Sequence, residues 1–389
     1  MPEPSKEASL VRGKLPGLPV MPPMCRLLVL TLALATLVPT AVSAQRSAAV
    51  ISPEADESGG VTFRLRAGKA QEVILRGQWT KEPLPMTRET DGLWQVTVPA
   101  IPAGVWEYSF VVDGLTITDP ANPEQKPQRT STASILHIPG SPPNPWDFQD
   151  VPHGSVHQHS YLSKSLGRRR EAWVYTPPGY EKDTAATCPL LVLQHGSGDR
   201  HDGWVTHGRA HWILDNLIAQ QKAQPMIVLM IDGHPLGMVP RDMTDRRAAS
   251  LQAFKTELLD EALPLVQDHY RVKPEPAQRA IAGLSMGGWQ ALSTGMTRLD
   301  QFATIGSFSG AVDEKEIQQA LDQPQQTNDR LRLLWIACGE KDFLLDRNLQ
   351  LIGLLKAKGI RHEWHLTAGD HSWPVWRNYL VDFAQKLFR

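Results

Sequence analysis

The second half of the sequence alternates short apolar runs with longer stretches of helical periodicity. The apolar runs read AWVYTP, LLVLQHG, MIVLMIDG, RAIAGLS, FATIGSFSG, LRLLWIACG and HEWHLT. Between and after them, helices are expected at 250–269, from 286, at 314–321, at 348–358 and from about 373. Strands joined by helices run parallel, and the helices cover both faces of their sheet. The alternation therefore predicts an α/β fold with a mainly parallel sheet.

The first half of the sequence has a different rhythm. Residues 60–138 contain the alternating runs VTFRLRA, EVILRGQW, LWQVTVPA, EYSFVVDG and ILHIP, separated by turn-forming residues. This pattern is typical of a small antiparallel β-sandwich with an immunoglobulin-like arrangement of strands. Trp79, Trp94 and Trp106 could stack on sugar rings, but packing in the sandwich core is the favoured alternative.

Composition shifts divide the chain into four segments. The apolar run LLVLTLALATLV follows Arg26 and leads to Val42-Ser43-Ala44, which predicts a secretory signal peptide at 1–44; the alternative is an uncleaved anchor. The sandwich is expected at 45–140, a proline-rich linker at 141–152 and the α/β domain at 153–389. The protein is therefore expected to be secreted or periplasmic.

Charge excludes some classes of partner. The 40 Lys and Arg residues nearly cancel the 41 Asp and Glu residues, so no overall field favours nucleic acid or an anionic membrane. The oligomeric state stays open. Beyond the predicted signal peptide only Cys188 and Cys338 remain, and they flank parallel strands at opposite ends. Because a disulfide tolerates a Cα separation of only about 7 Å, two free thiols are expected.

A G-x-S-x-G motif supplies the first candidate for chemistry. It reads Gly283-Leu284-Ser285-Met286-Gly287 and lies between a strand-like and a helix-compatible segment. This is the setting of a nucleophile elbow, in which small residues let strand and helix backbones approach and the helix N-terminus faces a developing oxyanion. Ser285 is the predicted nucleophile. Ser307 and Ser309 also lie among glycines, but they break the spacing.

A serine hydroxyl needs a base, and the base needs an orienting carboxylate. In this fold the order along the chain is serine, acid, histidine. Asp342 follows the run LRLLWIACG, and His371 lies between HEWHLT and the last predicted helix, so both fall at the carboxyl edge of the sheet. Glu340 and Asp346 are the alternatives for the acid. This chemistry requires no metal and no cofactor.

The glycine-rich turn Gln194-His195-Gly196-Ser197-Gly198 follows a strand and can direct a backbone N–H at the oxyanion. We expect the oxyanion hole to be formed by the amides of Met286 and Ser197, with Gly196 setting the turn.

Candidates for substrate contacts come from aromatic residues and from one long loop. The aromatic candidates for holding a phenolic ring, which could equally be core residues, are Trp204, Trp289, Trp373 and Trp376. The polar candidates, two of which lie in the loop at 233–246, are His201, Asp202, His234 and Arg241.

Two other clusters in the sequence are possible sites. His153, His157 and His159 could form part of a metal site, but no nearby carboxylate or cysteine completes the ligand set, so none is predicted. The basic cluster at 168–170 is expected to be solvated before a strand.

With these motifs in place, residues 153–389 resemble the esterase D-like branch of the α/β-hydrolases, and most closely the feruloyl esterases of carbohydrate esterase family one. The matching stretches are VPHGSVHQHSYLSKSLG, RREAWVYTPPGY, LQHGSGD, AGLSMGG, CGEKD and GDHSWPVW. The stretch before the linker resembles the E-set modules related to glycogen-binding carbohydrate modules.

The resemblance implies a serine esterase that releases hydroxycinnamic acids from arabinoxylan through a Ser-His-Asp triad and an acyl-enzyme. The implied partners are feruloylated or acetylated plant polysaccharide or its oligosaccharides. An acetyl xylan esterase and an enterochelin-type siderophore esterase are the alternatives, and a basic pocket would favour the latter. A non-catalytic, polysaccharide-binding protein is a third possibility that the complete triad disfavours.

Overall fold

The computed structural model describes residues 49–56, 59–238 and 243–389. Residues 49–389 form one compact unit. The signal peptide predicted at 1–44 lies outside the described residues. Within the part of the chain that is described, no helix is long and apolar enough to cross a membrane.

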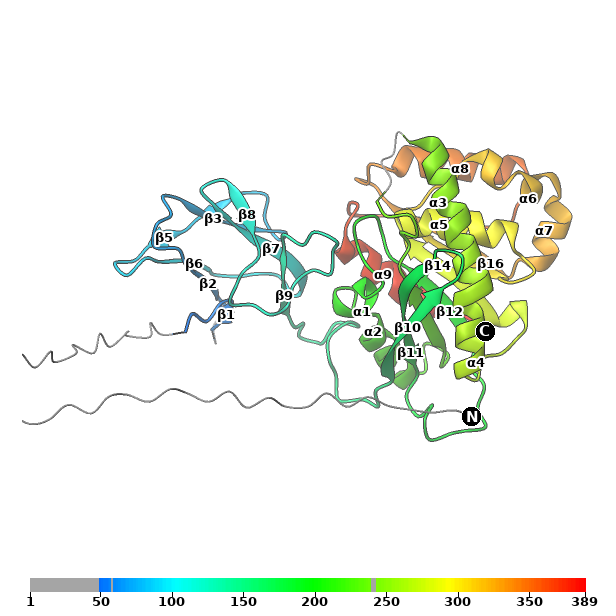
Figure 1. The fold of residues 1–389 in the computed structure, drawn as a ribbon, viewed down its shortest axis with the longest axis horizontal. Coiled ribbons are helices and arrows are strands. Elements are labelled where there is room, and N and C mark those ends of the chain that lie inside the picture. Colours follow the sequence, from blue (N-terminus) through cyan, green and yellow to red (C-terminus); the bar gives the residue numbers. More distant parts are fainter. Residues whose placement is uncertain (1–48, 57–58, 239–242) are drawn as a thin grey trace, which may run out of the picture. The chain divides into compact units, whose positions relative to one another are not determined.

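The first described region is a sandwich of two antiparallel sheets (Figure 1). One sheet has the order β1 (Glu54–Ala55), β2 (Val61–Arg66), β6 (Leu93–Val98) and β5 (Thr87–Arg88). The other has β4 (Leu84–Pro85), β3 (Val73–Gly77), β7 (Gly104–Val112) and β8 (Leu115–Ile117), and β9 (Ser134–Ile138) also pairs with β7. Alternate residues of β2 and β3 are buried, as the period of two predicts.

The three tryptophans of the sandwich contribute to its core. Trp94 is buried and donates its ring N–H to the carbonyl of Ala67, while the Trp79 ring stacks on Phe63 at 5.6 Å. Trp106 is half-buried and donates its ring N–H to a nearby backbone carbonyl. The core alternative is therefore the one that the structure supports.

The second region is built on one sheet of eight strands. Their order is β10 (Ser155–Ser163), β11 (Arg168–Thr176), β13 (Ile227–Ile231), β12 (Leu190–Gln194), β14 (Arg279–Leu284), β15 (Thr304–Phe308), β16 (Leu333–Gly339) and β17 (Glu363–Thr367). The pairs β10–β11 and β11–β13 are antiparallel, and the pairs from β13 through β12 to β17 are parallel. Functional groups at the carboxyl ends of the parallel strands consequently meet at one edge.

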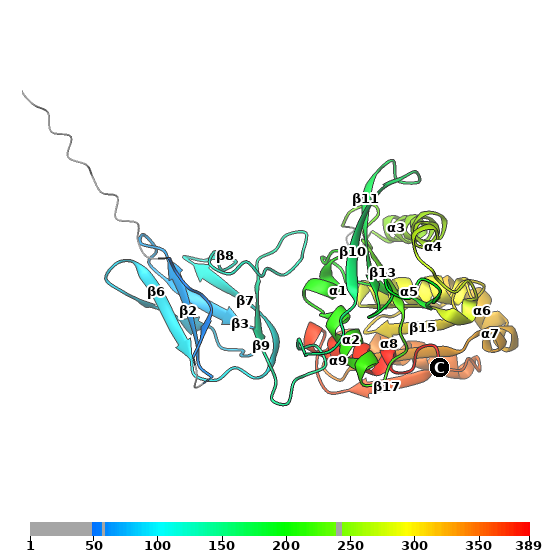
Figure 2. The same cartoon turned by 90° about the horizontal axis from the view of Figure 1, so that it is seen from below.

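Helices cover both faces of this sheet (Figure 2). One core contains residues of α3 (Thr244–Glu257), α4 (Leu263–His269), α5 (Met286–Thr297), α6 (Gln318–Asp322) and α8 (Leu345–Ala357). The other contains residues of α1 (Gly203–Thr206), α2 (Ala210–Ala219) and α9 (Trp373–Ala384). Along β12, Leu190 and Val192 belong to the first core and Leu191 and Leu193 to the second. The predicted α/β-hydrolase with a β-sandwich before it is thus confirmed as a fold class.

Several helix boundaries differ from those predicted. The helix expected at 250–269 is split into α3 and α4 by a π-helical turn, Leu258–Ala262, and Figure 1 shows the parts following one another as a rod. Pro264 lies in the first turn of α4, where its missing N–H is tolerated. The helix expected at 314–321 is a 3₁₀ turn, Glu314–Glu316, followed by α6. The prediction missed α7 (Pro324–Arg330), α1, α2 and β10.

Two expectations about single residues have clear outcomes. Cys188 and Cys338 are free and buried, as predicted. The expectation that the cluster at 168–170 is solvated is wrong for Arg170, which is buried. Its guanidinium donates to both carboxylate oxygens of Glu257, at 2.6 and 2.9 Å, and to the backbone carbonyl of Asp232 at 2.5 Å. The alternation of β11 turns this side chain inward.

We predict that Arg170→Met lowers the free energy of unfolding by about 3 kcal/mol, because it leaves the carboxylate of Glu257 buried without its ionic partner. The adjacent Arg169 is exposed, so Arg169→Met is the matched control and should change stability by less than about 0.5 kcal/mol. Urea unfolding of both variants measures the difference, and equal effects would contradict the assignment.

Candidate active site

Ser285 lies on a strained turn between β14 and α5. Its φ of 52° and ψ of −114° are unusual for a residue with a side chain. Its amide donates to the carbonyl of Phe308 on β15 at 2.8 Å. A Cβ atom on Gly283 would lie 2.6 Å from the backbone of Gly287, and one on Gly287 would lie 2.6 Å from the carbonyl oxygen of Gln194. Only glycine fits at these two positions.

A row of hydrogen bonds connects Ser285, His371 and Asp342. His371, in the loop between β17 and α9, places Nε2 2.8 Å from Ser285 Oγ and Nδ1 2.8 and 2.9 Å from the two carboxylate oxygens of Asp342. A carboxylate only accepts, so Nδ1 carries the hydrogen and Nε2 is free to accept the serine proton. This arrangement can activate a hydroxyl as a nucleophile.

The carboxyl group of Asp342 is held in its ionised form. Burial by itself would raise its pKa, but hydrogen bonds from His371, from the amide of Leu344 at 2.8 Å and from Ser309 lower it below the usual range. A carboxylate in this state can orient the imidazole and stabilise its charged form.

The alternative residues for the acid and for the nucleophile are either exposed or bonded to other partners. Glu340 and Asp346 are exposed. The Ser307 hydroxyl donates to the carbonyl of Gly310, and Ser309 accepts the ring N–H of Trp376. None of them replaces a member of the hydrogen-bonded row.

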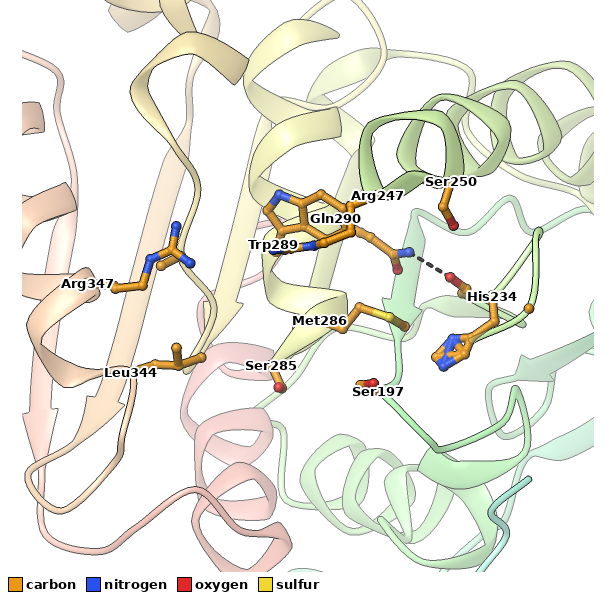
Figure 3. Close-up of a pocket in the computed structure, with 13 residues that line it drawn as sticks. Ser197, His234, Arg247, Ser250, Ser285, Met286, Trp289, Gln290, Leu344 and Arg347 are labelled. Carbon is orange, nitrogen blue, oxygen red and sulfur yellow. Dashed lines mark hydrogen bonds between the residues drawn. The ribbon is translucent and has the colours of Figure 1, made fainter. Parts of the chain in front are cut away.

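The glycine-rich turn after β12 passes directly over the elbow. A Cβ atom on Gly196 would lie 2.6 Å from the Leu284 side chain and 3.5 Å from Cβ of Ser285. Met286 is the first residue of α5, so its amide has no acceptor within the helix. Figure 3 shows Ser197 across the opening from Ser285, with Met286 behind them.

Two histidines hold this turn, and the sequence analysis did not assign them that role. His195 donates from Nδ1 to the carbonyl of Gly196 at 2.8 Å and accepts the Gly233 amide at Nε2 at 2.9 Å. His234 accepts the Gly198 amide at Nε2 at 3.1 Å. Burial, together with the nearby His195, lowers the pKa of His234 to about 4, so at neutral pH its ring is uncharged and able to accept.

An open cavity lies on one side of Ser285; its empty space is about 840 Å³ when the solvent at its mouth is included. Trp289 lies against it, and its ring N–H donates to both carboxylate oxygens of Glu316. The guanidinium of Arg247 lies 4.9 Å from the centre of the Trp289 ring, and Arg347, which pairs with Asp313, reaches in from α8 (Figure 3). Neither arginine can be recognised from the sequence as a lining residue, because helix periodicity does not show which neighbour a helix face meets.

A second open cavity adjoins Ser285 and His371; its empty space is about 580 Å³ when the solvent at its mouth is included. Its hydrolase side includes Asp199 from the turn after β12, and its sandwich side consists of Gln78, Glu107, Lys126 and Gln128. Lys126 and Glu107 form an ion pair at 2.8 Å. The lining is therefore largely polar, and side chains of both regions contribute to it.

The candidate substrate contacts have different positions. His234 and Trp289 line the first cavity, and the largely buried Trp373 and Trp376 line the second. The expectation for Trp204 is wrong: the side chain is 0% exposed, packs on Phe308 and Trp373, and donates to the carbonyl of Gln194.

The expectation for His201 and Asp202 is also not met, because they belong to the lining of neither cavity. His201 is buried against Trp173 instead. Arg241 lies outside the described residues.

The histidines at the start of the second region have protein partners. His153 Nδ1 lies 2.8 Å from the Asp215 carboxylate, His157 Nε2 lies 3.1 Å from the Thr176 hydroxyl, and His159 Nε2 lies 2.6 Å from the Tyr270 hydroxyl. In the described ranges, no group of three or more His, Cys, Asp or Glu residues could hold a metal ion.

Comparison with known proteins shows the family of this chain. The model of the Esterase family, described as "Putative esterase", matches residues 163–387, and the model of carbohydrate-binding module 48, the isoamylase N-terminal domain, matches residues 50–123. An endo-1,4-beta-xylanase/feruloyl esterase of Xylanibacter ruminicola is 28% identical over 351 residues, which cover 87% of this chain and 46% of that protein. This chain thus spans about half the length of that relative.

Other relatives and solved structures have similar esterase descriptions. The iron(III) enterobactin esterase of Escherichia coli K12 is 25% identical over 289 residues, 70% of this chain and 68% of that protein. A ferulic acid esterase of Anaeromyces mucronatus has a TM-score of 0.54 at 22% identity and covers 62% of this chain and 93% of its own. The enterobactin esterase of Shigella flexneri has a TM-score of 0.59 at 22% identity, with coverages of 85% and 94%.

At these identities the two solved structures show a shared fold. The family model covers more than half of the chain, and the region it covers includes the row formed by Ser285, His371 and Asp342. The chain belongs to the Esterase family, and a carbohydrate-binding module 48 domain precedes its esterase region.

Proposed function

We propose that this chain is a secreted or periplasmic serine carboxylic-ester hydrolase that acts on hydroxycinnamoyl esters of plant polysaccharide. The observation that carries the proposal is the hydrogen-bonded row Asp342–His371–Ser285 on a strained elbow. Two cavities adjoin this row, one for each side of an ester.

The geometry supports a two-stage reaction. Ser285 Oγ attacks the ester carbonyl while His371 Nε2 takes its proton, and Asp342 stabilises the resulting imidazolium. The amides of Met286 and Ser197 are the proposed donors to the oxyanion. His371 then protonates the leaving alcohol. In the second stage His371 takes a proton from water as the water oxygen attacks the acyl-enzyme, then returns that proton to Ser285 Oγ as the acid is released.

We assign the first cavity to the acyl group. Trp289 is one helical turn beyond Ser285, and its amide donates to the Ser285 carbonyl at 3.0 Å. Trp289 and Leu344 line the same cavity as Ser285, so an aromatic ring attached to the ester carbonyl can lie against them. A hydroxycinnamoyl group such as ferulate has such a ring, and the similarity to the Xylanibacter endo-1,4-beta-xylanase/feruloyl esterase supports this assignment.

We assign the second cavity to the leaving alcohol. Its sandwich side offers amide, carboxylate and ammonium groups, from Gln78, Glu107 and Lys126, which can hydrogen-bond to sugar hydroxyls. This lining suits a feruloylated arabinoxylan chain or one of its oligosaccharides better than an apolar alcohol.

A catecholate siderophore ester is the second candidate, and the two arginines of the first cavity favour it. Arg247 and Arg347 could receive anionic oxygens. Arg347 already pairs with Asp313, and the Trp289 ring beside Arg247 is bonded to the Glu316 carboxylate, so carboxylates offset much of the positive charge. An acetyl group carries no ring to lie against Trp289 and Leu344, which disfavours an acetyl xylan esterase.

Replacing the nucleophile tests the proposal. We expect Ser285→Ala to lower kcat for methyl ferulate by a factor of at least about 10⁴, because both stages pass through its oxygen. Ser307→Ala, in the other glycine-flanked serine segment, is the matched control and should retain activity. The rate of ferulate release, determined by chromatography, is measured for both variants. Substantial turnover by the Ser285 variant would refute the assignment.

A substrate panel tests the acyl and alcohol assignments. We expect kcat/KM to be highest for feruloylated arabinoxylan oligosaccharides, lower for methyl ferulate and lowest for acetylated xylan, since only the first substrate occupies both cavities. A faster reaction with a catecholate siderophore would favour the second candidate.

A variant at Gln78, tested on the same substrates, separates the two cavities. Gln78→Ala removes a polar side chain from the sandwich side of the second cavity. It should lower kcat/KM for the feruloylated oligosaccharide by several-fold, on the order of one hydrogen bond, and leave methyl ferulate unchanged. Equal losses on both substrates would argue against a sugar in this cavity.

The buried carboxyl group of Asp199 should make the folding stability of the protein depend on pH. Burial raises its pKa to about 6, although Lys126 and His195 act in the opposite direction. A raised pKa means that the folded protein binds the proton more tightly than the unfolded chain, so stability falls as pH rises from about 4 to 6. Asp199→Asn should therefore match the wild type near pH 4 and exceed it by on the order of 2 kcal/mol near pH 8. Thermal unfolding at both pH values measures this, and a variant less stable at high pH would contradict it.

A further inference from the structure

A segment of the sandwich pairs with the glycine-rich turn that lies over Ser285. The amide of Arg129 donates to the carbonyl of Gly198 at 3.0 Å, and Gln128 and Asp199 form an antiparallel β-bridge. Gly198 has a φ of +87°, and the turn Gly196–Ser197–Gly198 carries only one side chain. Such a turn has little packing of its own, so its conformation depends on the backbone contacts around it.

The side chain of Arg129 reaches a second support of the same turn. Its guanidinium pairs with the carboxylate of Asp232, the residue that follows β13. That carboxylate also accepts the His234 amide at 3.0 Å, and it lies 3.6 Å from His195 Nε2 and 3.4 Å from the Arg170 guanidinium. Burial would raise the pKa of Asp232, but His195, Arg170 and Arg129 together hold it well below the usual range.

These contacts link Arg129 to the amide of Ser197 by two routes. The first is direct, through the backbone bond to Gly198. The second passes through Asp232, whose carboxylate accepts the His234 amide. In the same loop the Gly233 amide donates to the His195 ring, and the His234 ring accepts the Gly198 amide. Both routes end on the residues that flank Ser197.

We propose that Arg129 is a positioning residue for the oxyanion hole, so that the β-sandwich region, through its segment between β8 and β9, contributes to the chemical step itself. The inference rests on the proposed assignment of the Ser197 amide to that hole. The proposal implies that the sandwich affects the rate of hydrolysis even for esters that are too small to contact it. Losing one oxyanion donor slows enzymes by about 10²–10³-fold, and a donor that is displaced rather than removed should cost roughly tenfold.

The test compares two ion pairs between the sandwich and the hydrolase region in the full chain. Arg129→Gln removes the pair with Asp232, and Glu124→Gln removes the pair with Arg209 at 2.7 Å, which does not contact the turn. The substrate is 4-nitrophenyl acetate. A trifluoromethyl ketone serves as the second probe, because its tetrahedral adduct with a serine places a negative oxygen in the oxyanion hole.

We expect Arg129→Gln to lower kcat roughly tenfold with KM within about twofold, and to weaken ketone inhibition by the same factor as kcat/KM. Glu124→Gln should leave all three values unchanged, and Arg129→Lys should restore part of the loss because it keeps the charge near Asp232. Equal effects of Arg129→Gln and Glu124→Gln, or a change in KM alone, would overturn the proposal.

Amide hydrogen exchange gives a readout that does not depend on activity. Peptides covering 195–199 should exchange faster in Arg129→Gln than in the wild type or in Glu124→Gln, which also covers the case of a poorly active variant. Unchanged exchange would overturn the proposal. A wild-type chain without esterase activity would instead refute the proposed function, so the two failures are distinguishable.

Discussion

Ser285 can face the two cavities only because three backbone segments cross at distances that exclude a Cβ atom. The end of β14, the start of α5 and the end of β12 meet at Gly283, Gly287 and Gln194. This close approach fixes the positive φ of Ser285 and aligns it with the first free amide of α5. The remaining parts of the site, from His371 to the turn after β12, are placed relative to this crossing.

Buried polar groups extend outward from the crossing in two directions. One set runs from His371 to Asp342 and is anchored at the carboxyl ends of β16 and β17. The other runs from His195 to Asp232 at the end of β13, and it continues to a side chain of the sandwich. The β-sandwich region is therefore connected to the site by charge and by backbone pairing, in addition to lining one cavity.

The sequence was sufficient to propose Ser285, Asp342 and His371, because their chemistry requires these residue types at the ends of successive parallel strands, and strand ends can be recognised. The walls of the site were harder to predict. Arg247 and Arg347 depend on which helix face meets which neighbour, and that is decided by packing between residues far apart in the chain.

Burial was the other source of error. Trp204 follows a turn near the site and has the chemistry of a ring-stacking residue, but its side chain is packed in the core between α1 and α9, against Trp373. Arg170 belongs to a basic cluster of the kind found on protein surfaces, yet the register of β11 directs it inward to Glu257.

The central claim is that Ser285 is the nucleophile. Its most direct test is labelling of the full chain with a fluorophosphonate, followed by mass spectrometry of the peptides. The account predicts a single modified serine, Ser285, and a label on any other serine with Ser285 unmodified would contradict it.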